Sequence, residues 1–145
     1  MGSGWGAGET ELLAFDAALN RAGMAQFNLL KVSSIIPPGA IRADSVDLPP
    51  GSLLPAAFGS TYSSLGGQVI SAAVAVGLPA DPDEVGVIME FAGPVEEKAA
   101  LDKVRLMAER ALVNRGTYPR DILFSSASRS VEGPTAVFAG VALLP

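Results

Sequence analysis

The 145-residue chain contains no histidine and no cysteine. Their absence excludes histidine-based triads and dyads, thiolate nucleophiles, disulfides and the usual zinc sites, and no metal is expected. Catalysis would have to use carboxylates, hydroxyls, amides or lysine. The lysines are Lys31, Lys98 and Lys103, and two of them fall on what reads as a charged helix face. A cofactor bound to lysine, such as pyridoxal phosphate, is therefore not expected.

Charge is also scarce. Charged residues make up 17% of the chain and hydrophobic residues 49%, whereas an average soluble domain has roughly 25% charged residues. So little charge barely covers the surface of a monomer, which favours a buried interface between subunits. Ten basic residues stand against fifteen acidic ones, and no cluster of lysine and arginine could neutralise phosphates, so nucleic acid is not an expected partner.

No apolar run is long enough for a membrane span. The longest extends from Val69 to Ala80, interrupted by Ser71 and Pro79, and is well short of the ~20 residues that a transmembrane helix needs. The first positive charge is Arg21, so the start lacks the basic region of a secretory signal peptide. We expect no membrane partner and a cytoplasmic protein.

The length fits a single domain over residues 1–145. The glycine-rich residues 1–9 predict an irregular starting segment. Helical spacing and end signals predict helices over 10–22 and 94–115. Strands are predicted near 26–36, 52–58, 68–78, 84–92, 121–130 and 135–144, with turns at 66–67, 79–82 and 133–134. This order predicts an α+β fold, a layered α-β-β-α sandwich of mainly antiparallel strands with two helices outside.

The first candidate for chemistry is Asp16. Its spacing from Leu12 and Leu19 predicts a carboxylate on the apolar face of the first helix. A buried carboxylate needs a cation or several donors, so a site for a guanidinium or ammonium group would explain the position. The alternative is a helix cap or an internal salt bridge.

The second candidate is the pair Ser33-Ser34, one of three Ser-Ser pairs in the chain. A Ser-Ser pair has almost no specificity by itself, and ordinary strand serines are the alternative. This pair, however, lies in an apolar strand that ends at Pro37-Pro38. Burying two hydroxyls in such a strand costs free energy unless they are hydrogen-bonded, which suggests a functional role.

Four blocks of the sequence together carry a resemblance. They are LLAFDAALNRAG (12–23), NLLKVSSIIPPGA (28–40), LPPGSLLPAAFGS (48–60) and GVIMEFAG (86–93). In order and spacing they resemble pyruvoyl-dependent arginine decarboxylases over nearly the whole chain. Two departures stand out: the additional N-terminal strand that such proteins usually have is not evident in this short start, and Ala25-Gln26 replaces a Gly-Asn pair beside the substrate pocket.

The resemblance implies self-processing. The Ser34 hydroxyl attacks the Ser33 carbonyl, the peptide becomes an ester, and elimination followed by hydrolysis leaves a pyruvoyl group at residue 34. The products are chains 1–33 and 34–145. Such a reaction requires a strained, water-poor peptide with a donor near the developing oxyanion.

The resemblance also implies decarboxylation of arginine to agmatine, with the pyruvoyl group as electron sink. Glu90 would supply a proton, as a partly buried carboxyl with a raised pKa can. An exposed strand residue is the alternative, which the apolar neighbours of Glu90 disfavour. Asp16 would bind the guanidinium group, and Asn28 would orient reacting groups.

Leu19 and Ile35 are assigned to substrate binding by the same matching. In an unbroken strand Asn28 and Ser34 lie about 20 Å apart, at ~3.3 Å per residue. Active sites shared between subunits are therefore predicted, because an unbroken strand would keep Asn28 and Ser34 too far apart to serve one site within a chain. The resemblance implies a homo-trimer, or a hexamer of paired trimers.

Two other functions stay open. One is an uncleaved, non-catalytic oligomer with an amine-binding pocket, and the other is a pyruvoyl decarboxylase for another basic amino acid.

Overall fold

The computed structural model describes residues 1–43, 45 and 47–144. Its helices and strands follow in the order β1 (Gly2–Ala7), α1 (Glu11–Arg21), β2 (Asn28–Lys31), β3 (Ile35–Ile36), β4 (Leu53–Ser63), β5 (Val69–Pro79), β6 (Gly86–Gly93), α2 (Glu97–Val113), β7 (Pro119–Ser130) and β8 (Thr135–Ala142).

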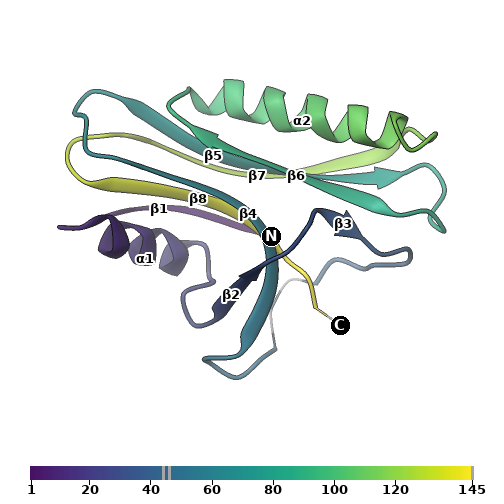
Figure 1. The fold of residues 1–145 in the computed structure, drawn as a ribbon, viewed down its shortest axis with the longest axis horizontal. Coiled ribbons are helices and arrows are strands. Elements are labelled where there is room, and N and C mark those ends of the chain that lie inside the picture. Colours follow the sequence, from purple (N-terminus) through teal and green to yellow (C-terminus); the bar gives the residue numbers. More distant parts are fainter. Residues whose placement is uncertain (44, 46, 145) are drawn as a thin grey trace.

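These elements form four layers. One sheet has the strand order β1-β8-β4-β2 and the other β3-β6-β5-β7. The sheets lie face to face, with α1 on the outer face of the first and α2 on the outer face of the second (Figure 1). The pairings are antiparallel apart from β2 with β4, which is parallel. The predicted α-β-β-α sandwich is confirmed.

The central strands are buried on both faces. In β5, Ile70, Ala72, Val74 and Val76 contribute to the core between the sheets, whereas Ala73 and its neighbour two residues on pack against α2. Successive side chains of a strand point to opposite faces. A strand covered on both sides therefore reads as a continuous apolar run, which is why sequence periodicity alone did not reveal the two cores.

The prediction of an irregular segment at residues 1–9 is wrong, because residues 2–7 form β1, which pairs with β8. Glycine at every second position places one bare face of this strand against α1. A Cβ atom at Gly2, Gly4 or Gly6 would overlap the backbone carbonyl oxygens of α1 and its C-cap. The alternating glycines thus permit a close strand–helix contact, and they have the strand period of two.

Both helices are confirmed, and each is followed by the glycine that was expected at its end. The hydroxyl of Thr10 accepts a hydrogen bond from the backbone N–H of Leu13 and caps α1. Gly23 follows the helix with φ of +74°, the left-handed conformation that glycine adopts without strain. Gly116 has the same role after α2, with φ of +81°.

Two predictions about strand connections need correction. The predicted strand 26–36 is divided into β2 and β3, which belong to different sheets. Residues 66–67 do not form a hairpin turn, because β4 and β5 also belong to different sheets. In both places the chain passes from one layer of the sandwich to the other, and local turn chemistry cannot distinguish such a crossing from a hairpin.

Within the described residues, neither helix combines the length and the apolar character that crossing a bilayer demands.

Candidate active site

Ser33 and Ser34 lie where the chain crosses between the two sheets. Upstream, the backbone N–H of Val32 donates to the carbonyl of Ala56 in β4, at 3.1 Å. Downstream, the Ser34 carbonyl accepts from the N–H of Ile88 in β6, at 2.9 Å. The peptide bond between the serines is therefore held at one end by each sheet, at the point where β3 joins the edge of β6 (Figure 1).

The Ser34 side chain is hydrogen-bonded to a carboxylate distant in the sequence. Its Oγ donates to Oε2 of Glu90, at 3.2 Å. Glu90 lies on β6, two residues after Ile88, and so on the same strand face, the face directed into the space between the sheets. The Glu90 side chain is 21% exposed, so the alternative that Glu90 is an ordinary exposed strand residue is wrong.

A cation completes this cluster. The Lys31 ammonium lies 4.0 Å from Oε1 of Glu90 and 4.9 Å from the centre of the Phe58 ring. Lys31 ends β2, three residues before Ser34. Sequence reasoning considered this lysine only as a possible cofactor anchor, because its neighbour Glu90 is far away in the chain.

The backbone folds tightly at Ser34. The N–H of Ile35 donates to the carbonyl oxygen of Ser33, at 3.0 Å, which closes a three-residue turn centred on Ser34. The described non-glycine residues have negative φ, so the turn is of the inverse type, which L residues adopt readily. The expected strain is thus not present as a left-handed conformation.

The expected exclusion of water is incomplete in a single chain. Ser33 is exposed and Ser34 is only half-buried. Ile35 is 38% exposed and Leu30 is 51% exposed, although both side chains are apolar.

Asn28 lies at the opposite end of β2. Its side-chain amide donates to the carbonyl of Gly51, at 2.7 Å, and its backbone N–H donates to the carbonyl of Ser52. These bonds tie the start of β2 to the loop before β4, and the Asn28 amide bonds to that loop rather than to Ser34. The structure therefore does not bring Asn28 and Ser34 together through a hydrogen bond within one chain.

Asp16 is exposed on α1, so the prediction that it is buried on the apolar face is wrong. The buried face of α1 is formed by Ala14 and Ala18, which lie against the glycine face of β1. Small residues decide this packing, and the larger Leu12 is 74% exposed. The capping alternative for Asp16 is wrong too, because Thr10 is the N-cap. Leu19 is half-buried beside the α1 core.

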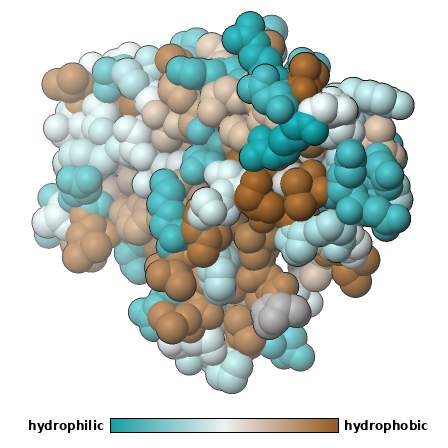
Figure 2. Space-filling model, turned by 45° about the vertical axis from the view of Figure 1, so that its right-hand side comes forward, coloured by the Kyte–Doolittle hydropathy of each residue, from teal (hydrophilic) through white to brown (hydrophobic). Residues whose placement is uncertain are grey.

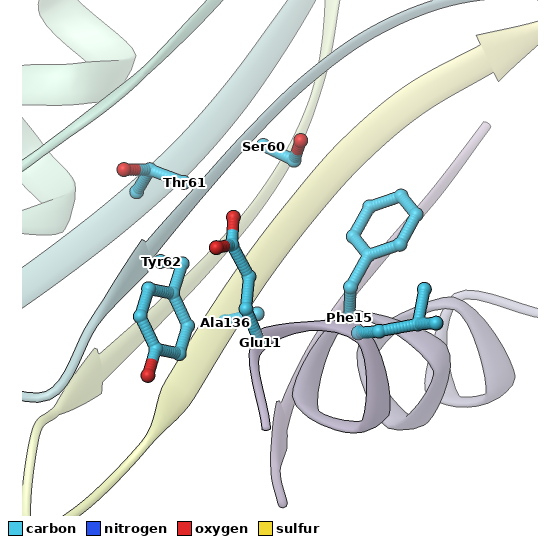
Figure 3. A pocket seen from close by; sticks show the side chains of 7 residues that line it. Glu11, Phe15, Ser60, Thr61, Tyr62 and Ala136 are labelled. Atoms are coloured by element: carbon cyan, nitrogen blue, oxygen red, sulfur yellow. The ribbon is translucent and has the colours of Figure 1, made fainter.

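A cavity among the described residues lies elsewhere, between α1 and β4. It has a volume of about 430 Å³ and is lined by Glu11, Leu12 and Phe15 together with residues 60–62 and Ala136. Figure 3 shows the Glu11 carboxylate extending from α1 toward β4, between Phe15 and Tyr62. This cavity is on the outer, helix-covered side of its sheet, whereas Ser34 and Glu90 meet at the space between the sheets. It is not the site of the serine pair.

Comparison with known proteins agrees with the earlier resemblance. The family model of pyruvoyl-dependent arginine decarboxylase matches residues 1–138. A protein of that name from Methanococcus aeolicus is 41% identical over 140 residues, covering 95% of this chain and 85% of the relative. The one from Methanocaldococcus jannaschii is 40% identical, covering 94% and 82%. The one from Pyrococcus horikoshii is 38% identical, covering 95% and 89%.

The match extends over both sheets and both helices, and it includes the serine pair, the strand that holds Glu90 and the helix that holds Asp16. Together with the fold, it shows that the chain belongs to the family of pyruvoyl-dependent arginine decarboxylases.

Proposed function

We propose that this protein cleaves itself between Ser33 and Ser34, converts Ser34 into a pyruvoyl group and then decarboxylates arginine to agmatine and carbon dioxide. The observation that carries the proposal is the hydrogen bond from Ser34 Oγ to Glu90 Oε2. A serine hydroxyl is a weak nucleophile, and an adjacent base activates it by accepting its proton. The names of the relatives support arginine as the substrate.

In the first step Glu90 accepts the proton of Ser34 Oγ while the oxygen attacks the carbonyl carbon of Ser33. The bond between this carbon and the Ser34 nitrogen breaks, the nitrogen takes up a proton, and an ester joins the two residues. Loss of the Ser34 Cα proton then breaks the Cβ–O bond and releases the carboxylate of Ser33. Addition of water and loss of ammonia leave a ketone at residue 34, so the products are chains 1–33 and 34–145.

The donor set at Ser34 fits this origin of the cofactor, because a hydroxyl, a carboxylate and a polarised carbonyl meet at one peptide bond. The pyruvoyl group supplies an electron sink for the loss of carbon dioxide, and neither pyridoxal phosphate nor a metal is part of the proposal. Glu90 protonates the substrate carbon after carbon dioxide has left. Asp16 binds the guanidinium in a charge-assisted pair, Asn28 orients reacting groups, and Leu19 and Ile35 contact the apolar part of the substrate.

Asp16 and Asn28 are not bonded to the Ser34–Glu90 pair within one chain, so we place the active site between subunits of a homo-trimer, or of a hexamer of paired trimers. Asp16 is exposed on α1, and Asn28 bonds to its own loop. Exposed apolar side chains such as Leu12, Leu30 and Leu53 border these regions, and Figure 2 shows apolar side chains gathered on the lower half of one face. A second copy of the chain over these surfaces would bury them and would exclude water from Ser33.

Two measurements on freshly purified protein test the proposal. Intact-mass analysis should show two fragments, the larger of which reacts through its ketone with phenylhydrazine. Radiolabelled arginine should release carbon dioxide. A full-length, unreactive chain would support a non-catalytic oligomer, and release from another basic amino acid would change the substrate while keeping the chemistry. We keep the cytoplasm as the predicted compartment, which cell fractionation would test.

A further inference from the structure

The tight turn at Ser34 gives the Ser33 carbonyl a donor of its own. The N–H of Ile35 points at the Ser33 carbonyl oxygen, with 3.0 Å between nitrogen and oxygen. This is the oxygen that would become negative if the Ser34 hydroxyl attacked the adjacent carbon. We propose that the backbone N–H of Ile35 is an oxyanion donor in self-cleavage; the inference rests on the self-cleavage proposed above and names a catalytic group for it.

The turn brings the three groups needed for the attack into adjacent residues. The attacking Oγ, the carbonyl that it attacks and the N–H that polarises this carbonyl all belong to residues 33–35. The attack passes through a five-membered ring, in which the carbonyl electron pair moves onto the oxygen as the Oγ–C bond forms. As charge grows on this oxygen, its hydrogen bond with Ile35 strengthens, and a donor already in place needs no reorganisation at that moment.

The anchors on either side keep this donor in position. The N–H of Ile88 holds the Ser34 carbonyl at 2.9 Å, and Ile35 pairs with Val87 in the ladder between β3 and β6. The N–H of Val32 is held by Ala56 in β4, at 3.1 Å. Because each sheet fixes one side of the turn, the Ile35 N–H and the Ser33 carbonyl have little freedom to separate before the attack.

The Asn28 side chain, which could also stabilise an oxyanion, is already engaged in another hydrogen bond. The amide of Asn28 would be a good oxyanion donor, but it donates to Gly51 at 2.7 Å, at the far end of β2. The donor on the Ser33 carbonyl comes from the main chain, so side-chain scanning would leave it in place. This explains why no residue type in the sequence indicated it.

The test replaces one backbone amide by an ester, through incorporation of the α-hydroxy acid analogue of isoleucine at position 35 during cell-free synthesis. This change removes the Ile35 N–H and keeps the side chain. We expect the cleavage between Ser33 and Ser34 to slow by at least about 10-fold, and by up to the 10²–10³-fold that loss of one oxyanion donor causes in acyl-transfer enzymes. Intact mass separates this cleavage from hydrolysis of the new ester, whose fragments differ by one residue.

The matched control is the same ester replacement at Val32. It also removes one backbone hydrogen bond beside the turn, to Ala56, but leaves the donor to Ser33 unchanged. Cleavage at equal rates in the two esters would overturn the inference. Failure of the unmodified chain to cleave at all would instead overturn the proposed function, so the two failures are distinguishable.

A second variant guards against loss of folding in the ester protein. Ile35→Pro removes the same N–H by a different change and can be expressed in cells, and circular dichroism in a Ser34→Ala background checks its fold. Slow cleavage in a folded Ile35→Pro chain is the expected result. Cleavage of Ile35→Pro at the rate of the unmodified chain would overturn the inference, whatever the ester protein shows.

Discussion

Ser34 Oγ donates a 3.2 Å hydrogen bond to Oε2 of Glu90, a residue 56 positions later in the chain. The hydroxyl thus lies against the carboxylate before any cleavage has taken place. A single carboxylate can accept the hydroxyl proton during self-cleavage and, once protonated, donate a proton after carbon dioxide is lost.

Glu90→Gln should slow self-cleavage by roughly 10²–10⁴-fold, the usual contribution of a positioned general base. Glutamine keeps the size of the side chain and an acceptor oxygen, but it cannot take up the proton. The measurement is the fraction of full-length chain against time, by intact mass. Glu84→Gln, at an exposed position before β6, is the control and should cleave normally. Equal rates in the two variants would refute the assignment of Glu90.

Lys31→Met should slow self-cleavage by a factor of roughly 2–5, because an exposed ion pair contributes only about 0.2–1 kcal/mol. The Lys31 ammonium lies 4.0 Å from Oε1 of Glu90 and is more than half exposed. Water therefore screens the electrostatic attraction between the ammonium and the Glu90 carboxylate. The effect should weaken further at high salt, and Lys31→Arg should restore the rate. A salt-independent loss that arginine does not restore would point to packing against Phe58 instead. Lys98→Met on α2 is the control.

Asp16→Asn should raise the KM for arginine by about 10–100-fold, which corresponds to the 1.5–3 kcal/mol of a hydrogen bond to a charged group. Self-cleavage should be unaffected, because the hydrogen bonds that position the serine pair come from β4 and β6 of its own chain and not from α1. Citrulline, which has the shape of arginine without its positive charge, serves as the comparison substrate, and its slow turnover should not fall in the variant. Unchanged arginine turnover would remove Asp16 from the site.

Mixing an inactive variant with one that is weakly active at low arginine concentration should restore activity if the active site lies between subunits. Ser34→Ala and Asp16→Asn, co-expressed and assayed at low arginine concentration, would combine an intact Ser34 of one chain with an intact Asp16 of another. Ser34→Ala mixed with Glu90→Gln is the control and should remain inactive, because both residues belong to the same cluster within one chain. Activity no greater than the sum of the two single variants would place the complete site within one chain.

Gly6→Ala should destabilise the protein by about 1–3 kcal/mol, the usual effect of overpacking. A Cβ atom at Gly6 would overlap the Ala14 carbonyl and would approach the Ala17 Cβ to 2.5 Å. Gly66→Ala is the matched control, because no atom lies within 4 Å of a Cβ at that position. Urea unfolding at fixed protein concentration, in a Ser34→Ala background, measures the difference. Equal midpoints would show that β1 can move away from α1.

The sequence predicted the elements whose signals are local. Gly23 follows the end of α1, as its helix-end signal predicts. The period of two in Gly2, Gly4 and Gly6 is also present in the sequence, but the glycine content of residues 1–9 predicts an irregular segment instead of a strand. Only the close contact with α1 gives the period its meaning.

By itself the sequence determined the two helices, the sandwich class, the family and the serine pair, because capping residues, periodicity and matching blocks are all properties of neighbouring positions. The tertiary structure decided that Asp16 is exposed, that residues 32–34 cross between sheets, and that Lys31 and Glu90 meet beside Ser34. These relationships depend on which strands pair and which faces they bury. Strand pairing joins residues far apart in the chain, and so no local pattern of residues encodes it.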